Sequence, residues 1–465
     1  MELTASVAAG AYVFSATNPA PAVVPPLDCE PPTAILGGYE AEGAISHGYQ
    51  CLWLCYGRGL SGLALLWRRL MFRTTFVAVT GSVGKTTATG CLAGILASRF
   101  SVNATQEGDN GRHGVAITVL RTRLRHRFAV VEVGTRRPGA LRKAAWEVDP
   151  DVVVVLGVGR THTDGFPTLD HTAAEKAALL SRMGRRGLAI LNGDDRRVAA
   201  MAGRCRGRVV TFGLSPQCDL WVSDVTCRWP SRLSFRAHWR GDAAAVSTKL
   251  VGEHWVPSVA GALAAAISCG MDLESAAVAM GRVEPQRARL EPVVLPSGAV
   301  MLRDEFNPTA VSLPSALRVL EHAQARRKFL VFNDVSDTGQ ETEERYRDLG
   351  RAFVRSTDVV VFHGANARCA AEAAVAAGMR PDCVLTFPTW WEVSGYLGSV
   401  LGVGDLVLLR CWETDHPERI FFTQFGTVAC KRTTCQRIHL CDLCEELHYQ
   451  PTEALPRHPA SPAAR

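Results

Sequence analysis

The stretch Phe76-Val77-Ala78-Val79-Thr80-Gly81-Ser82-Val83-Gly84-Lys85-Thr86-Thr87 decides the fold of the first half of the chain. Its apolar, β-branched start, Phe76 to Val79, predicts a buried parallel strand. The Ala/Leu-rich run from Ala88 to Leu96 predicts a helix directly after the loop. A strand, a glycine loop, Lys-Thr and a helix in this order predict a phosphate-binding loop, because N–H groups at a helix N-terminus point at a bound anion. The alternative is an ordinary strand-to-helix turn.

Each residue type in this loop suits a nucleotide phosphate. Gly81 and Gly84 let the backbone approach the anion, Lys85 can neutralise the outer phosphates, and the hydroxyl of Thr86 can bind Mg²⁺. The residues that we expect to contact the nucleotide are Thr80, Gly81, Ser82, Val83, Gly84, Lys85, Thr86 and Thr87. The loop therefore predicts an enzyme that uses ATP and Mg²⁺.

The composition of the chain limits the classes of protein to which it can belong. The chain has 465 residues, 47% hydrophobic and 21% charged, which is typical of a globular protein of two to four domains. The net charge of +6 comes mostly from scattered arginines with no nucleic-acid recognition motif, so we expect a solvated surface and no nucleic-acid partner. The first residues lack the pattern of a secretory signal, and the 15 cysteines suit a reducing compartment, which predicts a cytoplasmic protein.

The patterning predicts an α/β fold, with a parallel-sheet ATPase domain followed by a smaller Rossmann-like α/β domain. Buried strands and helices alternate from Phe76 onward, which favours a parallel sheet. Asp219 to Val251 instead alternates polar and apolar residues and predicts an antiparallel addition to that sheet. The expected segments are an Ala/Pro-rich, disordered 1–48, a helical 49–74, the ATPase domain 75–285, the Rossmann-like domain 286–425 and a Cys-rich tail 426–465.

The helical segment 49–74 carries a Trp/Leu stripe interrupted and closed by arginines. Its uninterrupted apolar part is too short to span a bilayer. An interfacial helix on a membrane surface is one interpretation, and a helix packed on the ATPase domain is favoured over it.

Three further positions carry candidate chemistry beside the loop. Glu132 ends a predicted strand, where ligands of parallel sheets gather, and its carboxylate suits Mg²⁺. His162 follows the next strand after two glycines, so it is either a ligand or an ordinary histidine. Lys176 lies on a predicted helix among Ala and Leu, where a lysine alone is typical of a surface position.

The order of motifs resembles the Mur ligase family, most closely the branch that adds D-Ala-D-Ala to UDP-N-acetylmuramoyl-tripeptide. The resemblance runs from Phe76 to about Ile420 and does not include the family's usual N-terminal UDP-sugar-binding domain. The motifs that carry it are Thr80 to Thr87, Asn110 with Gly114-Val115, Val131-Glu132-Val133-Gly134, His162 to Phe166, Lys176, Leu191-Asn192-Gly193-Asp194-Asp195, Arg289-Leu290-Glu291, Asp304-Glu305-Phe306-Asn307-Pro308 and Asn333 to Gly339.

This resemblance implies an ATP-dependent carboxylate–amine ligase. In the family, ATP phosphorylates a carboxylate to an acyl phosphate, and an amine then displaces the phosphate. By the resemblance, Lys85 holds the β- and γ-phosphates, Thr86 and Glu132 hold one Mg²⁺, and His162 with a carbamylated Lys176 positions a second. Arg289, Asp304 and Asn307 then face the nucleotide or the reacting groups, and Asp334 and Asp337 lie near the incoming amine.

The chain departs from the family pattern at several positions. The family's His-Asn-x-x-Asn helix start, which contacts adenine, is here His254-Trp255-Val256-Pro257-Ser258. Both asparagines are replaced, and Trp255 could stack on the purine instead. The family's Lys-Gly-Ser near the end of the third domain is Arg410-Cys411-Trp412. We therefore expect an altered adenine pocket and a carboxylate substrate from a peptidoglycan-like or natural-product pathway.

The tail carries four cysteines, Cys430, Cys435, Cys441 and Cys444. The Cys441-x-x-Cys444 spacing is typical of a zinc knuckle, and the other two cysteines could complete a tetrahedral structural Zn²⁺ site. Free or redox-active thiols are the alternative.

Two other functions stay open from the sequence. A P-loop kinase or nucleotidase needs the phosphate loop but no lysine carbamate. A non-catalytic subunit that binds nucleotide would explain the lost asparagines. The expected partners are a carboxylate and an amine, either small molecules or peptides, and the sequence predicts no oligomeric state.

Overall fold

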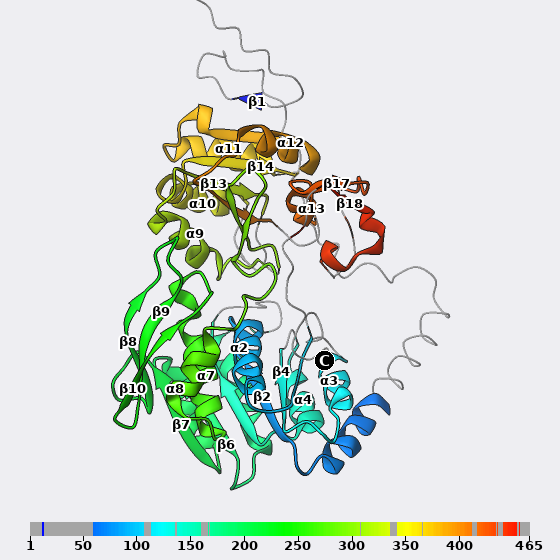
Figure 1. Ribbon diagram of the computed structural model, residues 1–465, viewed down its shortest axis with the longest axis vertical. Coiled ribbons are helices and arrows are strands. Elements are labelled where there is room, and N and C mark those ends of the chain that lie inside the picture. The colour runs from blue at the N-terminus through cyan, green and yellow to red at the C-terminus, as the bar shows by residue number, and fades with distance from the viewer. Residues whose placement is uncertain are drawn as a thin grey trace, which may run out of the picture.

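The protein is described by a computed structural model that covers residues 12–13, 59–106, 113–134, 137–159, 166, 168–306, 308–334, 342–364, 366–411, 416–433, 435, 440–452 and 455. Two large sheets form its two halves, and a small two-stranded sheet belongs to the tail (Figure 1). The first sheet is blue to green in Figure 1, and the second is yellow-green to orange except for β1, which is dark blue.

The first sheet has nine strands in the order β10-β9-β8-β7-β6-β5-β2-β4-β3. Its parallel part consists of β2 (Thr75–Thr80), β3 (Val102–Ala104), β4 (Phe128–Glu132), β5 (Val152–Val155), β6 (Leu188–Asn192) and β7 (Arg208–Gly213). These strands are buried on both faces, which explains their continuous apolar sequences. The strands predicted from the apolar runs Phe76 to Val79, Phe128 to Val133, Asp151 to Leu156 and Leu188 to Leu191 are confirmed, whereas β3 and β7 were not predicted.

Helices cover both faces of this sheet. One face packs on α2 (Lys85–Ala97), α7 (Val256–Ser268) and α8 (Leu273–Met280). The other packs on α3 (Gly114–Arg121), α4 (Ala140–Val148), α5 (Leu169–Ala177) and the short α6 (Arg196–Ala199). Side chains of one strand alternate between the two cores: Val130 faces the first and Val131 the second.

The antiparallel addition predicted for Asp219 to Val251 is confirmed. It consists of β8 (Leu220–Thr226), β9 (Ser234–Trp239) and β10 (Asp242–Ser247), and it extends the edge of the sheet beyond β7. It also reaches the second half of the chain: the Arg228 side chain donates to the His322 carbonyl at 3.1 Å, and the Gln324 N–H donates to the Trp229 carbonyl at 3.0 Å.

The second sheet has the order β1-β15-β14-β13-β16-β12-β11. Its parallel strands are β12 (Val300–Arg303), β13 (Arg327–Phe332), β14 (Val359–His363), β15 (Val384–Phe387) and β16 (Asp405–Arg410). The edges are antiparallel, with β11 (Glu291–Val294) at one side and the two residues of β1 (Tyr12–Val13) at the other. All five parallel strands were predicted from the apolar runs Val300 to Leu302, Phe329 to Phe332, Val359 to Phe362, Val384 to Phe387 and Leu406 to Leu409.

Helices also cover both faces of the second sheet. One face packs on α9 (Leu313–His322), α10 (Thr342–Ser356) and α11 (Ala367–Ala376). The other packs on α12 (Trp390–Val400), α13 (Glu418–Phe422) and the tail, which includes β17 (Gly426–Val428) and β18 (Tyr449–Pro451). The α/β fold class predicted from the sequence is confirmed.

Residues 59–70 form a helix that packs on the first sheet. Ala64 is fully buried, and the Trp67 indole donates to the Thr122 carbonyl at 2.8 Å. Leu63 and Leu66 lie on the outer face, each 59% exposed. Within the described residues, no helix has the length and apolarity that crossing a membrane requires.

Candidate functional site

The phosphate loop lies where the order of the first sheet reverses. Strand β2 lies between β4 and β5, and the chain leaves β2 to build β3 and β4 on one side before crossing to β5 on the other. Ligands of doubly wound sheets bind at this point, outside the carboxyl ends of the strands. The loops after β2, β4 and β5 therefore define the candidate site (Figure 1).

Helix α2 begins at Lys85, directly after the loop, and Gly84 caps it with a positive φ of 82°. The Lys85 ammonium donates to the carbonyls of Gly81 at 3.0 Å and Ser82 at 3.3 Å, so it lies over its own loop. A Cβ at Gly84 would come within 2.4 Å of the Ser258 hydroxyl oxygen. Position 84 therefore requires glycine for both its backbone conformation and its space.

Neighbouring loops hold the phosphate loop from three sides. Ser258, at the start of α7, donates to the Gly84 carbonyl at 3.1 Å. Ser82 donates to the Gly159 carbonyl at 3.0 Å and accepts from the Gly159 N–H at 2.8 Å. Thr80 donates to the Val133 carbonyl at 2.9 Å. Because these bonds join the loop to the ends of β4 and β5, its shape is fixed by the sheet edge as well as by its own sequence.

Glu132 ends β4 and is 3% exposed, and its N–H donates to the Thr105 hydroxyl at 2.9 Å. Thr86 is half-buried in the first turn of α2, while Thr87 beside it is buried. The pairing of β2 with β4 places Val79 opposite Glu132, one residue before the loop begins at Thr80. The strand register therefore brings the predicted metal-binding residues Thr86 and Glu132 to one edge of the sheet.

Lys176 differs from a surface lysine. It lies in the last turn of α5 and is 4% exposed. Burial and the nearby charge of Lys85 lower the pKa of Lys176 to about 7, and Glu175 opposes them only weakly. A large part of this side chain is therefore a neutral amine near neutral pH.

Several predicted site residues lie outside the described residues. These are His162, Asn307, Asp337 and Trp412. Their proposed roles stay predictions from the sequence.

At the second sheet, Asp304 directly follows β12, Arg410 ends the neighbouring β16, and the two form a buried ion pair. Arg410 also donates to the Thr309 carbonyl at 3.1 Å and to the Ser312 hydroxyl at 2.7 Å. Burial raises the pKa of Asp304, although the charges of Arg410 and Arg289 oppose that rise. The structure thus brings Asp304 near Arg289, both of which the resemblance placed at the nucleotide or the reacting groups, and adds Arg410, for which no role was predicted.

Asp334 follows β13 at the same edge of the second sheet. Its carboxylate accepts from Arg345 at 3.1 Å and from the Asn366 amide at 3.0 Å. The Tyr346 hydroxyl donates to the carbonyl of the preceding Asn333 at 3.3 Å. Asp334 is therefore held in place by side chains from α10 and from the loop before α11.

A cavity of about 480 Å³ lies between the first sheet and α9. Its walls include Asn192, Asp194, His254, Pro257 and Arg318. Burial and the charges of Arg410 and Arg318 lower the pKa of His254 to about 3, so this ring is neutral at physiological pH. The size and the mixed apolar and polar walls suit a small organic group such as a nucleotide base.

The suggested stacking of Trp255 on the purine is wrong. Trp255 is 5% exposed and belongs to the core between the first sheet and α7, while the His254 ring lies against it at 4.4 Å between centroids and lines the cavity. The sequence could not show whether His254 or Trp255 lines the cavity, because both aromatic residues lie directly before α7. Ser258 is not in the cavity wall either, since it points at the phosphate loop.

Comparison with known proteins agrees with this arrangement. A family model described as the Mur ligase middle domain matches residues 79–266, which contain the phosphate loop, Glu132 and Lys176. A UDP-N-acetylmuramoyl-tripeptide--D-alanyl-D-alanine ligase of Mycobacterium tuberculosis is 29% identical over 367 residues, which are 75% of this chain and 69% of that protein. The chain is similar to the Mur ligase family in sequence and in fold. It is an ATP-dependent enzyme that forms amide bonds.

Further Mur ligases match over shorter or more divergent stretches. The Escherichia coli ligase of the same name is 26% identical over 292 residues, covering 62% of this chain and 63% of that one. MurF from Acinetobacter baumannii superimposes with a TM-score of 0.72 at 23% identity, over 78% of this chain and 79% of that chain. MurF from Thermotoga maritima in complex with ADP gives 0.69 at 20% identity, over 79% and 83%. These structures share the fold of this chain.

Proposed function

We propose that this enzyme joins the carboxylate of a peptide to the amino group of an amino acid or dipeptide, in a peptidoglycan-like or natural-product pathway. The names of its relatives support this substrate class, because those enzymes extend a tripeptide with a dipeptide. The single observation that carries the assignment of the site is the burial of Lys176 near Lys85, at the edge of the sheet that bears the phosphate loop.

In the proposed reaction, a carboxylate oxygen attacks the γ-phosphorus of ATP, the bond to the β-phosphate oxygen breaks, and ADP leaves. The amine nitrogen then attacks the carbonyl carbon of the acyl phosphate, and phosphate leaves with the C–O bond electrons. The amine proton passes to a base. Lys85 and the N–H groups at the start of α2 bind the phosphates, since cations and helix N-termini stabilise the charge that builds on the transferring group.

Lys176 is suited to carbamate formation. Its neutral amine can add to CO₂, forming an N–C bond and releasing a proton, and the product is a buried carboxylate on a long side chain. An ammonium cannot make this addition, so the lowered pKa of Lys176 supports the modification. The resulting oxygen ligands, with Glu132 and the Thr86 hydroxyl, match what Mg²⁺ prefers, and bound Mg²⁺ would neutralise the phosphate charges.

The second half of the chain supplies the groups that meet the substrates. Arg410 and Arg289 hold Asp304 at the edge that faces the reacting groups in the proposed complex. Asp334, held by Arg345 and Asn366, is the proposed contact for the incoming amine. The cavity beside His254 and Arg318 is the proposed place of the adenine. We also propose that the reaction takes place in the cytoplasm, because ATP and Mg²⁺ are abundant in that compartment.

Acyl phosphate formation can be tested with hydroxylamine, which captures an acyl phosphate as a hydroxamate. The wild type is incubated with ATP, Mg²⁺, bicarbonate and a panel of peptide carboxylates, and the Lys85→Ala variant is assayed in parallel. We expect ATP-dependent hydroxamate from one class of carboxylate and a loss of about 100-fold or more in Lys85→Ala, because a charge-stabilising donor is removed.

Lys328→Ala is the matched control, since Lys328 is the second residue of β13 and does not line the cavity. It should retain wild-type hydroxamate formation. ATP turnover by the wild type with phosphate transferred to a hydroxyl acceptor, and no hydroxamate from any carboxylate, would contradict the proposal.

A further inference from the structure

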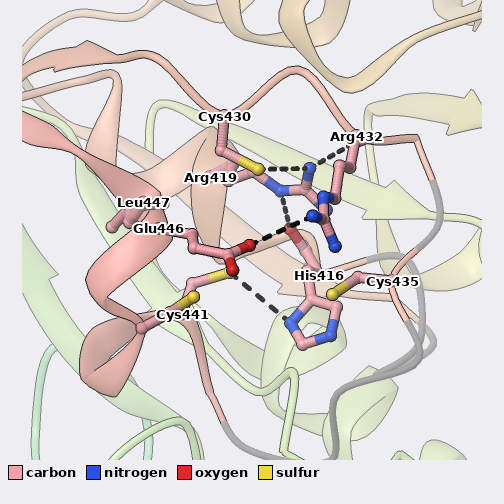
Figure 2. A pocket seen from close by; sticks show the side chains of 9 residues that line it. His416, Arg419, Cys430, Arg432, Cys435, Cys441, Glu446 and Leu447 are labelled. Atoms are coloured by element: carbon pink, nitrogen blue, oxygen red, sulfur yellow. Dashed lines mark hydrogen bonds and ion pairs between the residues drawn. The ribbon is translucent and has the colours of Figure 1, made fainter.

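The Cys-rich tail encloses a small pocket beside the second sheet. It has a volume of about 10 Å³, close to that of one water molecule or one ion. Figure 2 shows Cys430, Cys435 and Cys441 reaching toward it from different sides, with His416 between them. Cys444 also lines it, so all four cysteines that the sequence singled out meet at one place.

Two residues that the sequence did not single out join them. His416 Nδ1, a Glu418 carboxylate oxygen and Cys441 Sγ lie within 4.8 Å of one another, and all three residues are buried. Nδ1 is 3.4 Å from Sγ and 3.8 Å from Glu418 Oε2. Two ligands of one tetrahedral zinc ion are separated by about 3.5 Å, given Zn–N and Zn–S bonds of about 2.0 and 2.3 Å. The three atoms therefore have the spacing of ligands to a shared ion.

An unsatisfied carboxylate oxygen points to a cation. Glu418 is 1% exposed, and its Oε2 atom has no hydrogen-bond partner among the described residues. A buried carboxylate oxygen without a partner is costly, and a bound cation removes that cost. The same buried space holds neutral sulfur ligands that become thiolates on binding a soft metal ion.

We propose that this pocket binds one divalent cation of the zinc class. Cys441 and Cys444, from a single turn, and His416 are three ligands, and Cys430, Cys435 or Glu418 supplies the fourth. The Cys444 N–H donates to the Cys441 carbonyl at 3.0 Å, which closes the turn between the two sulfurs. Four protein ligands leave no open position, so the ion is structural.

The position of Asp442 shows what the ion stabilises. This residue lies in the turn between Cys441 and Cys444, and its two carboxylate oxygens accept from Arg303 at 2.9 and 2.8 Å. Arg287, in the segment that connects the two sheets, lies 3.5 Å from the same carboxylate. Arg303 precedes Asp304 in sequence. The ion therefore fixes the tail against both the connecting segment and the strand that leads to Asp304.

Metal content of the full chain tests the site. The wild type, expressed with zinc in the medium, should contain about one zinc ion per chain by elemental mass spectrometry. Cys441→Ser should lose it, whereas Cys205→Ser, which changes a cysteine in the first half of the chain, should keep it. A wild type without zinc, or full retention of zinc in Cys441→Ser, would overturn the proposal.

Cobalt substitution of the wild type keeps the test decisive if Cys441→Ser does not fold. Co²⁺ bound by two or more thiolates gives strong near-ultraviolet charge-transfer absorption and intense tetrahedral visible bands. A Co²⁺ complex without thiolate absorption would contradict the ligand set. Removing the ion with a chelator should lower the melting temperature of the wild type, because binding energy at such a site is folding energy. An unchanged melting temperature would contradict the structural role.

Discussion

The carboxyl ends of the two sheets carry polar groups of opposite character. At the first sheet, the buried Lys176 and the phosphate-loop Lys85 lie near enough for their charges to interact, and Lys85 is held by backbone carbonyls. At the second sheet, Asp304 and Asp334 are each held by an arginine side chain, Arg410 and Arg345. The first edge thus presents the Lys85 ammonium to a ligand, whereas the carboxylates of the second are already paired with arginines.

This difference assigns different tasks to the two edges. The Lys85 ammonium and the N–H groups at the start of α2 favour a polyanion such as the phosphates of ATP. Paired carboxylates are fixed in orientation, and they change the geometry of the site little when a substrate arrives. The first edge therefore performs the phosphate chemistry, and the second positions the groups that react with it.

The largest expected effect comes from breaking the ion pair of the second edge. Arg410→Met leaves the buried Asp304 without its arginine and should reduce the free energy of unfolding by about 3–5 kcal/mol. Adding Asp304→Asn to Arg410→Met should restore part of the loss, since the uncompensated charge is then removed. Denaturant unfolding of the two single variants and the double variant measures this coupling.

Arg368→Ala is the matched control for that cycle. Arg368 pairs with Glu372 on the surface of α11, where the two side chains are 78% and 54% exposed. Its loss should change the free energy of unfolding by less than about 1 kcal/mol. If Arg410→Met and Arg368→Ala reduced the free energy of unfolding equally, the buried Asp304–Arg410 ion pair would contribute no more to stability than a surface pair, which would contradict this account.

Replacing Lys176 tests the first edge. Lys176→Ala should lower kcat by about 100-fold or more while the chain stays folded, because the carbamate that would hold Mg²⁺ against the reacting phosphates is lost. Acetate should restore part of the activity if it occupies the space of the missing carbamate. Full activity in Lys176→Ala would favour a kinase or nucleotidase, which needs no carbamate.

The lowered pKa of Lys176 predicts that activity depends on pH in a graded way. Below a pKa of about 7 the side chain is an ammonium and cannot add CO₂, so carbamylation falls as the pH falls. At fixed dissolved CO₂, the modified fraction and the initial rate should decrease about 100-fold per pH unit below pH 7, because the ammonium loses one proton before the addition and a second proton is released by it. Mass spectrometry after trapping of the carbamate, together with initial rates, measures both quantities. A profile that is flat down to pH 5 would contradict the lowered pKa.

The smallest effect concerns the contact between α7 and the phosphate loop. Ser258→Ala removes one hydrogen bond to the Gly84 carbonyl and should raise KM for ATP about fivefold, equivalent to about 1 kcal/mol. Gly84→Ala should weaken ATP binding more, because the new Cβ would meet the Ser258 oxygen and the positive φ becomes strained. A larger effect in Ser258→Ala than in Gly84→Ala would contradict this account of the loop.

The sequence predicted most of the fold because buried parallel strands are continuous apolar runs. Phe76 to Val79 and Leu406 to Leu409, for example, lie inside β2 and β16 as expected. The phosphate loop was predictable for a related reason, since its glycines and Lys-Thr are contiguous. The edge strand β11 was missed because its four residues, with Pro292 among them, carry little periodicity.

Residues that act together across the fold could not be predicted from their neighbours in sequence. Arg410 was noted only as a departure from a motif, and its pairing with Asp304 depends on the adjacency of β12 and β16. The burial of Lys176 depends on how α5 packs, whereas its sequence context is that of a surface lysine. His416 and Glu418 lie 25 and 23 residues before Cys441, too far for a metal-ligand spacing to reveal them.

The most direct test of the proposed chemistry follows the carboxylate oxygen. The carboxylate identified by hydroxamate formation is labelled with ¹⁸O and converted to product with ATP and the amine. Acyl phosphate formation predicts that each inorganic phosphate released carries one oxygen from the labelled carboxylate, because the C–O bond breaks when the amine attacks. Phosphate without label, at the same yield of product, would contradict the account.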